Sequence, residues 1–167
     1  MELKQTFKNH IIASWYSWFA LLIFALVWRY VNFDMDFLLI GGLFYFFFSI
    51  LGFYLHIEYF FRNKGEKIEI NHSYIIINKD GAEKKYNSDE LVKIILYRSF
   101  NLDKWGGITL MSMEYYNYAR IITKSGEDII ITCLLTPKVE EAVRQLNDVP
   151  YERRNLAFCS TKIRGAI

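Results

Sequence analysis

The sequence holds few of the residues that metal and catalytic sites need. It has two cysteines and three histidines in 167 residues. Two cysteines are too few for the disulfide framework of a small secreted domain. The three histidines, His10, His56 and His72, lie too far apart along the chain for a zinc-ligand motif, and no phosphate-binding loop or nucleophile motif occurs. We therefore expect no metal, no cofactor and no catalytic residue.

Net charge is also nearly absent. The 20 basic and 18 acidic residues leave a charge of +2, and this excess lies wholly in residues 64–167. A nucleic-acid partner requires a much larger basic excess, so we expect none. The sequence is rich instead in aromatic residues, and 20 of the 30 lie in residues 1–63. Its mean hydropathy of +0.09 therefore averages an apolar part and a polar part, which excludes an entirely soluble globule and a disordered chain.

Two long uncharged runs near the start of the chain predict transmembrane helices. Residues 11–28 carry no formal charge, and in residues 37–57 only His56 can become charged near neutral pH. At about 1.5 Å per residue, helices over these runs reach about 30 Å, the thickness of the hydrocarbon core of a bilayer. We expect spans over about 11–30 and 37–60, joined by a short loop into an antiparallel hairpin.

Two details of these runs lead to further expectations. Small residues such as Gly41 and Gly52 let another helix approach closely in lipid, so we expect them to pack within the hairpin. His56 lies at one end of the second run, where we expect it to reach the headgroups and not to relay protons. A cleavable signal peptide is the alternative for the first run, because Lys4 and Lys8 precede it. A second run follows at once and no Ala-x-Ala site is present, so we favour two spans.

The basic residues around the two runs predict their orientation. Only Arg29 lies in the connecting loop, whereas five basic residues flank the outer ends: Lys4, Lys8, Arg62, Lys64 and Lys67. Basic flanks remain in the cytoplasm. We therefore expect a bacterial inner-membrane protein with both termini in the cytoplasm, and we expect Arg62, Lys64 and Lys67 to lie at the anionic membrane surface.

The remainder of the chain has the period of β-strands. Apolar and polar residues alternate, or β-branched residues cluster, in six runs: 68–70, 74–77, 92–96, 108–113, 116–123 and 128–135. The pairs Asp80-Gly81 and Ser125-Gly126 predict tight turns between strands. Strands joined by such short turns pair antiparallel, so we expect a mostly antiparallel sheet in a domain over residues 64–150.

The period changes near the end of this domain. Four apolar residues follow one another at helical spacing: Val139, Ala142, Val143 and Leu146. Thr136 suits the N-cap of a helix, and Pro137 suits its first position. We therefore expect an amphipathic C-terminal helix whose apolar stripe covers the sheet.

Residues 151–167 follow this helix as a basic tail. Basic side chains are attracted to an anionic membrane surface, so we expect Arg153 and Arg154 to lie there together with the basic residues that follow the second span. A solvated tail without fixed structure is an equal alternative.

Several short strands followed by one helix resemble the pleckstrin-homology-like (PH-like) domains of bacterial membrane proteins. The similarity lies in four segments: Ile-Glu-Ile-Asn at 68–71, Tyr-Ile-Ile-Ile at 74–77, Tyr-Asn-Ser-Asp-Glu-Leu at 86–91 and Gly-Glu-Asp-Ile-Ile-Ile-Thr at 126–132. The resemblance implies an α+β fold in which a membrane hairpin carries a PH-like antiparallel barrel or sandwich, and a binding or scaffolding module without chemistry of its own. The loop that holds lipid headgroups in many PH domains corresponds to residues 71–73, which lack Lys and Arg, so inositol-phosphate recognition is not expected.

Two stretches are candidates for binding a partner. Lys104 and Trp105 precede two glycines in an expected loop, where an exposed Trp would anchor a partner or the membrane. Tyr115 and Tyr116 belong to a dense Met and Tyr stretch of the kind used at interaction surfaces. The alternative in both cases is burial, because Trp105 could close the barrel and every second residue of a strand faces the core.

We therefore expect a membrane-anchored, non-catalytic binding module whose partners are the lipid bilayer and a protein or a second copy of itself. The alternative is an accessory subunit of a membrane transporter or enzyme whose active part lies on another chain. A small membrane enzyme that uses carboxylates such as Glu114 or Asp128 is the least favoured alternative.

Overall fold

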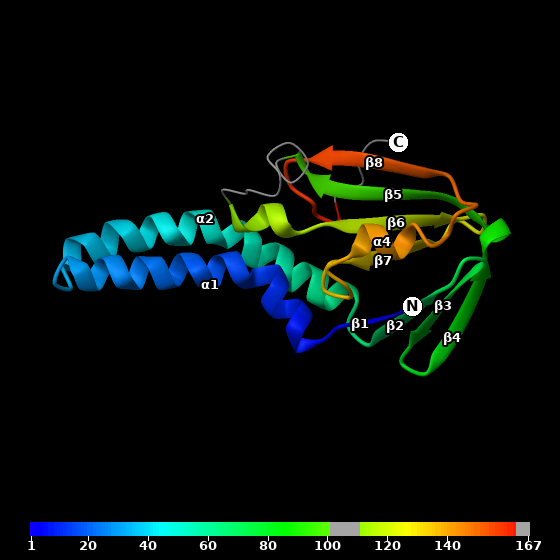
Figure 1. Ribbon diagram of the computed structural model, residues 1–167, viewed down its shortest axis with the longest axis horizontal. Coiled ribbons are helices and arrows are strands. Elements are labelled where there is room, and N and C mark those ends of the chain that lie inside the picture. The colour runs from blue at the N-terminus through cyan, green and yellow to red at the C-terminus, as the bar shows by residue number, and fades with distance from the viewer. Residues whose placement is uncertain (101–110, 163–167) are drawn as a thin grey trace.

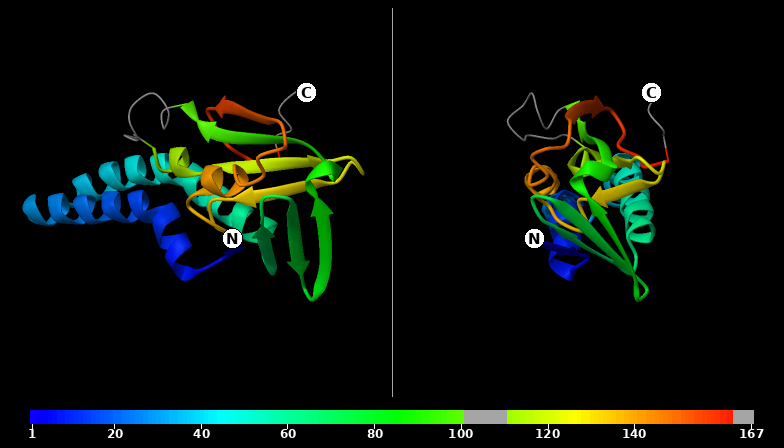
Figure 2. Two further views of the ribbon diagram at one scale, coloured as in Figure 1. Left: turned by 45° about the vertical axis from the view of Figure 1, so that its right-hand side comes forward. Right: turned by 90° about the vertical axis from the view of Figure 1, so that its right-hand side faces the viewer.

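The protein consists of a helical hairpin and a β-rich part from which the hairpin projects (Figure 1). The computed structural model describes residues 1–100 and 111–162, apart from the side chain of Phe48. Helix α1 covers Phe7–Tyr30 and helix α2 covers Met35–Arg62. The two helices run antiparallel and side by side, away from the strands (Figures 1 and 2).

Local contacts fix the hairpin. The Thr6 hydroxyl and the Asp34 carboxylate each accept a hydrogen bond from a backbone N–H in the first turn of the helix that follows, at 3.2 and 2.7 Å. Gly41 of α2 lies against Phe24 of α1, and a Cβ atom at this glycine would come within 2.6 Å of the ring. This close approach confirms the prediction that Gly41 packs within the hairpin.

Most large apolar side chains of the hairpin point outward. Trp18, Leu22, Leu43 and Phe47 are between 56% and 70% exposed. By length and composition, α1 is able to cross a membrane, and α2 passes the same test when its two halves, bent by 43°, are taken as one span. Monomeric soluble proteins rarely leave so large an apolar surface uncovered. The outer surface of the hairpin is therefore typical of helices that contact lipid or a partner.

The first sheet has four antiparallel strands in the order β1-β2-β3-β4. Its strands are β1 (Glu2–Lys4), β2 (Glu66–Ile70), β3 (Tyr74–Lys79) and β4 (Ala82–Asn87). The β3–β4 turn is the predicted Asp80-Gly81 pair, whose φ angles of 52° and 86° are both positive. The sequence does not predict β1, because three residues are too few to show a period. It precedes α1 and pairs with β2, with Leu3 opposite Ile68.

The second sheet has the order β7-β6-β5-β8. Its strands are β5 (Leu91–Ser99), β6 (Tyr118–Thr123), β7 (Asp128–Thr132) and β8 (Tyr151–Leu156). The first three pair antiparallel, as predicted, but β8 pairs parallel to β5. Residues 151–156 thus form an edge strand where the sequence predicts the start of a basic tail. Edge strands often carry charged side chains, which discourage pairing with another chain. Strand β8 therefore lacks the apolar alternation by which the inner strands are predicted.

The C-terminal helix is present but shorter than expected. Helix α4 covers only Val139–Val143, and it packs against β6 (Figure 1). Its predicted apolar stripe, Leu146 included, is buried. The Thr136 hydroxyl accepts a hydrogen bond from Lys138 N at 3.3 Å in the turn before the helix, so the helix begins later than predicted.

Two short 3-10 helices complete the fold, η1 (Ser88–Glu90) and η2 (Ser112–Tyr115). The sequence predicts a strand over 108–113, but residues 112 and 113 belong to η2, while 108–110 lie outside the described residues. Glu114 accounts for the difference, because its side chain accepts a hydrogen bond from Met111 N at 3.4 Å and caps the short helix.

The second half of α2 belongs to the core of the β-rich part. Leu55 and Tyr59 are fully buried together with apolar residues of both sheets. A Cβ atom at Gly52 would overlap the side chain of Ser112 in η2, so this glycine packs against the β-rich part. The prediction that Gly52 packs against α1 within the hairpin is wrong. The predicted span over 37–60 therefore includes about three turns that pack on protein along one face.

Candidate functional site

Of the four residues predicted to bind a partner, the structure describes two, Tyr115 and Tyr116. Lys104 and Trp105 lie outside the described residues. Tyr115 is half-buried, and its ring centroid lies 6.0 Å from that of Trp15 and 5.8 Å from that of Tyr16, both on α1. Tyr115 therefore holds η2 against the hairpin.

Tyr116 is buried, with 2% of its surface exposed, which agrees with the alternative of burial for this stretch. Its hydroxyl lies 2.9 Å from His56 Nδ1, and His56 Nε2 lies 2.9 Å from His10 Nδ1. This polar chain joins Tyr116, the residue that follows η2, to both helices. His56 is thus held between two side chains where the sequence predicts contact with headgroups. Its partners are 46 and 60 residues away, too far for any spacing in the sequence to show them.

The basic residues predicted at the membrane surface are divided between two places. Arg62, Lys64 and Lys67 are exposed at or just after the end of α2. Arg153 and Arg154 lie on β8, where both form ion pairs with carboxylates. The structure does not bring these five residues together, and the charges of the two on β8 are offset by their partners.

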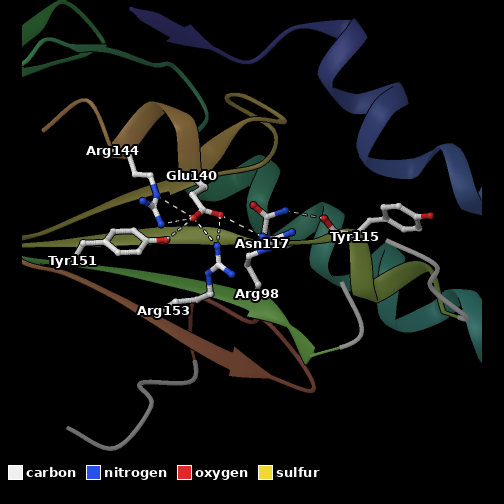
Figure 3. Close-up of polar contacts among 7 residues, drawn as sticks. All are labelled: Arg98, Tyr115, Asn117, Glu140, Arg144, Tyr151 and Arg153. Atoms are coloured by element: carbon white, nitrogen blue, oxygen red, sulfur yellow. Dashed lines mark hydrogen bonds and ion pairs between the residues drawn. The ribbon is translucent and has the colours of Figure 1, made fainter. Parts of the chain in front are cut away.

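Arg153 belongs to a cluster centred on Glu140 (Figure 3). Its Nη2 donates to both oxygens of the Glu140 carboxylate, at 2.6 and 2.7 Å. Arg144 Nε, Tyr151 OH and Arg98 Nη1 donate at 3.0, 3.2 and 3.3 Å. Burial alone would raise the pKa of Glu140, but the hydrogen bonds and charges of Arg153 and Arg144 outweigh burial and lower it. The cluster fastens α4 to β5 and β8, so these cations serve the fold.

A groove of about 750 Å³ lies between the second half of α2 and the second sheet. We name it the junction groove. Its wall on α2 carries Tyr54, Ile57 and Phe61, and its wall on the strands carries Tyr97 and Tyr118. Both walls therefore present aromatic and apolar surface to the groove.

Charged side chains also line the junction groove: Arg62, Lys79, Arg120, Lys162, Glu58 and Asp128. Lys79 pairs with Glu66 at 2.9 Å, and Arg120 pairs with Asp128 at 2.7 Å. Arg62 and Lys162 form no ion pair with any residue that the structure describes. Arg120 Nε is buried and has no hydrogen-bond partner among the residues that the structure describes.

Residues that follow β8 close one side of the groove. The Glu58 carboxylate accepts hydrogen bonds from Thr161 N at 2.6 Å, from Thr161 Oγ1 at 2.5 Å and from Ser160 Oγ at 2.8 Å. Tyr59 OH donates to Cys159 O at 2.6 Å. Hydrogen bonds to a charged carboxylate are among the stronger ones, so this segment is fixed on α2. The sequence predicts a tail here and shows no sign of the contact, because the partners are at least 100 residues apart.

The two candidate carboxylates and the two thiols are engaged in the fold. Glu114, one carboxylate of the enzyme alternative, is 5% exposed and caps η2, and the other, Asp128, pairs with a cation. Burial raises the pKa of the Cys133 and Cys159 thiols to about 12, so both stay protonated and unreactive. Within residues 1–100 and 111–162, no group of three His, Cys, Asp or Glu side chains is placed to hold a metal ion.

Comparison with known proteins gives one result. A family model described as PH domain matches residues 2–142, which run from β1 through both helices to α4. No curated protein and no solved structure matches the chain. The N-terminal helices and the two four-stranded sheets are consistent with this fold. Because the match covers well over half of its length, the chain belongs to the PH domain family.

Proposed function

We propose that the protein is a membrane-anchored binding module: a PH domain that α1 and α2, as a two-span hairpin, hold against the cytoplasmic face of a bacterial inner membrane. PH domains are typically non-catalytic and bind other molecules, which suits a chain in which Glu114 caps η2 and both described thiols are buried. In this arrangement the junction groove lies where the hairpin leaves the bilayer, and it is the place where we expect a ligand.

The pairing of β1 with β2 carries this proposal. Strand β1 precedes α1, strand β2 follows α2, and three residue pairs join them, from Glu2 opposite Glu69 to Lys4 opposite Lys67. Both ends of the hairpin meet in one sheet and must lie on the same side of a membrane that the helices cross. The basic flanks lie at these ends, which is the cytoplasmic side by the positive-inside rule.

The surroundings of α1 support its role as an anchor. A core helix of a soluble protein is mostly buried, whereas 11% of the most apolar stretch of α1 is buried. A signal peptide is removed, yet cleavage after α1 would also remove β1, whose Leu3 is 1% exposed in the core. It would remove Asn9 too, which donates a hydrogen bond to Leu135 O at 2.8 Å. These contacts favour a permanent anchor.

Cysteine labelling in cells tests the topology. The native Cys133 and Cys159 are buried, so a membrane-impermeant maleimide should leave the parent protein unlabelled. Met35→Cys, at an exposed position next to the hairpin turn, should be labelled in intact cells. Lys124→Cys, exposed in the β6–β7 turn, should be labelled only after lysis. Labelling of Lys124→Cys in intact cells would reject the proposed orientation.

A further inference from the structure

We propose that the junction groove binds one anionic phospholipid of the inner leaflet, with the phosphate beside Arg62 and Lys162 and an acyl chain along the aromatic wall of α2. This inference rests on the proposed membrane anchoring and adds the class of ligand. The groove is partly built from residues outside the family match, since Thr161 and Lys162 line it and the match ends at residue 142.

The groove comes next along α2 after the outer half, which we assign to the bilayer. Its residues on α2 lie in the inner half, beyond the bend of 43°. Ile57 and Phe61 are 57% and 65% exposed on this half, and Arg62 lies about 7.5 Å beyond Ile57 along the helix. Tyr54 and Ile57 are therefore nearer to the bilayer than the cationic end of the groove, which places acyl chains along the former and phosphates beside the latter.

The two cations at this end have no carboxylate partner. Arg62 and Lys162 are both exposed, and neither forms an ion pair within the part of the chain that the structure describes. Lys162 Nζ lies 5.7 Å from the centre of the Tyr54 ring, so one cation stands directly beside the apolar wall. An amphiphile with an anionic head and an apolar chain matches this combination.

The two carboxylates of the groove are already engaged within the protein. Asp128 pairs with Arg120 at 2.7 Å, so its charge is offset. Both oxygens of Glu58 accept hydrogen bonds from the neutral groups of Ser160 and Thr161, which fix this carboxylate on the segment after β8. The free cations of the groove, Arg62 and Lys162, therefore outnumber its one unpaired carboxylate.

The size and lining of the groove distinguish a lipid from smaller anions. A groove of about 750 Å³ is far larger than a phosphate ion and falls within the range of about 300–1,000 Å³ for sites that enclose larger ligands. An acidic peptide would match the cations but would leave Tyr54, Ile57 and Phe61 without an apolar partner. A phospholipid matches both features.

Native mass spectrometry of the full chain in detergent measures the binding. We expect the protein to retain phosphatidylglycerol in preference to phosphatidylethanolamine at equal concentration. The double variant Arg62→Gln/Lys162→Gln should bind phosphatidylglycerol about tenfold more weakly, because it removes both unpaired cations. The matched control Lys64→Gln/Lys67→Gln removes the same charge outside the groove and should change binding by less than about twofold. The charge-preserving variant Arg62→Lys/Lys162→Arg should restore most of the affinity.

Three outcomes would overturn the inference: no preference for phosphatidylglycerol, equal losses in the two Gln double variants, or displacement of the lipid by an equal amount of glycerol phosphate, which would show a site for a free phosphate. Extraction of membranes with alkaline carbonate separates this inference from the proposed function. Release of the protein would show that the anchoring is wrong. Retention of the protein in membranes without a lipid preference would reject only the assignment of the groove.

Discussion

Helix α2 is apolar along its whole length, but its two halves have different surroundings. In the outer half, Met35–Phe47, the side chains of Leu43 and Phe44 are 69% and 63% exposed. In the inner half, Ser49–Arg62, Leu55 and Tyr59 are fully buried. Both halves are apolar, so hydropathy alone does not distinguish a helix that faces lipid from a helix that forms part of a protein core. The elements packed around each half make the difference.

The elements that pack against the two halves of α2 explain why the hairpin and the PH domain form one unit. The outer half contacts α1, and Gly41 allows the close approach. The inner half contacts η2 and, through Glu58 and Tyr59, the segment that follows β8. A single helix therefore connects the apolar surface that we assign to the bilayer with the core of the domain, without a flexible linker between them.

Replacing one leucine by alanine in each half of α2 should give the largest difference in the free energy of unfolding. Leu55→Ala should lower the free energy of unfolding by about 2–5 kcal/mol, because it leaves a cavity at a fully buried position. Leu43→Ala, at a position 69% exposed, should lower it by less than about 0.5 kcal/mol. Thermal unfolding of the purified protein in detergent measures both. Equal losses would show that the outer half is also packed on protein, and the comparison would fail.

Removal of a buried amide at the end of the inner half should have the next largest effect. The Asn63 side chain is fully buried, donates to Ile130 O at 2.8 Å and accepts from Thr132 Oγ1 at 2.7 Å. Asn63→Ala leaves these groups unpaired and should cost about 2–3 kcal/mol, with faster hydrogen exchange in β7. The control Asn78→Ala, on β3, should cost less than about 0.5 kcal/mol. Unchanged exchange in β7 would mean that Asn63 does not join the helix to the sheet.

Removal of one tyrosine hydroxyl in each half of α2 compares how much their hydrogen bonds stabilise the protein. Tyr59 OH donates to Cys159 O at 2.6 Å inside the domain, and Tyr45 OH donates to Ser17 O at 3.1 Å between the helices. Tyr59→Phe should cost about 1–2 kcal/mol, because a buried carbonyl loses its donor. Tyr45→Phe should cost about 0.5 kcal/mol, the usual value between membrane helices. Unfolding in the same detergent measures both, and a larger loss for Tyr45→Phe would reverse the assignment of the halves.

A modest, pH-dependent effect is expected away from α2, in the Glu140 cluster. Burial opposes the shift, but Arg153 and Arg144 lower the pKa of Glu140 below its usual value of 4.5. A lowered pKa in the folded state means that this stabilisation is present above about pH 4.5 and is lost as the pH falls through the folded value. Glu140→Gln should therefore lower the free energy of unfolding by about 1 kcal/mol at pH 7 and by less at pH 3.

The matched control for this variant is Glu83→Gln. Glu83 is exposed on β4, and its substitution should change stability little at either pH. Thermal unfolding of both variants at the two pH values is the measurement. A cost of Glu140→Gln that stays the same at pH 3 would show that the charge of Glu140 does not stabilise the sheet.

Much of the fold follows from periodicity, and the failures have a common cause. The Asp80-Gly81 turn and the apolar stripe that includes Val139 could be predicted because each is a local pattern. Strands β1 and β8 could not, since one is three residues long and the other is polar, and each is a strand because of its partner. Long-range pairing does not appear in local composition.

The candidate site was less predictable than the fold. Of the groove residues, Arg62 is a predicted membrane-surface residue and Lys162 belongs to the predicted basic tail. Tyr54, Arg120 and Lys162 come from α2, from β6 and from the segment after β8, and no spacing in the chain shows that these elements meet. Tyr116 is an example of the opposite kind. Tyrosine is common at interfaces, but Tyr116 is buried in the core and its hydroxyl bonds to His56.

Spin labels in lipid nanodiscs test whether the outer half of the hairpin lies in hydrocarbon. Nitroxides at Leu43→Cys and Lys124→Cys report collisions with oxygen, which concentrates in the bilayer, and with a water-soluble nickel chelate. Both native thiols are buried and should not take the label. We predict that the label at position 43 collides mainly with oxygen and the label at position 124 mainly with nickel. Equal access of nickel to both labels would show that the hairpin lies in water and that the protein is not anchored by it.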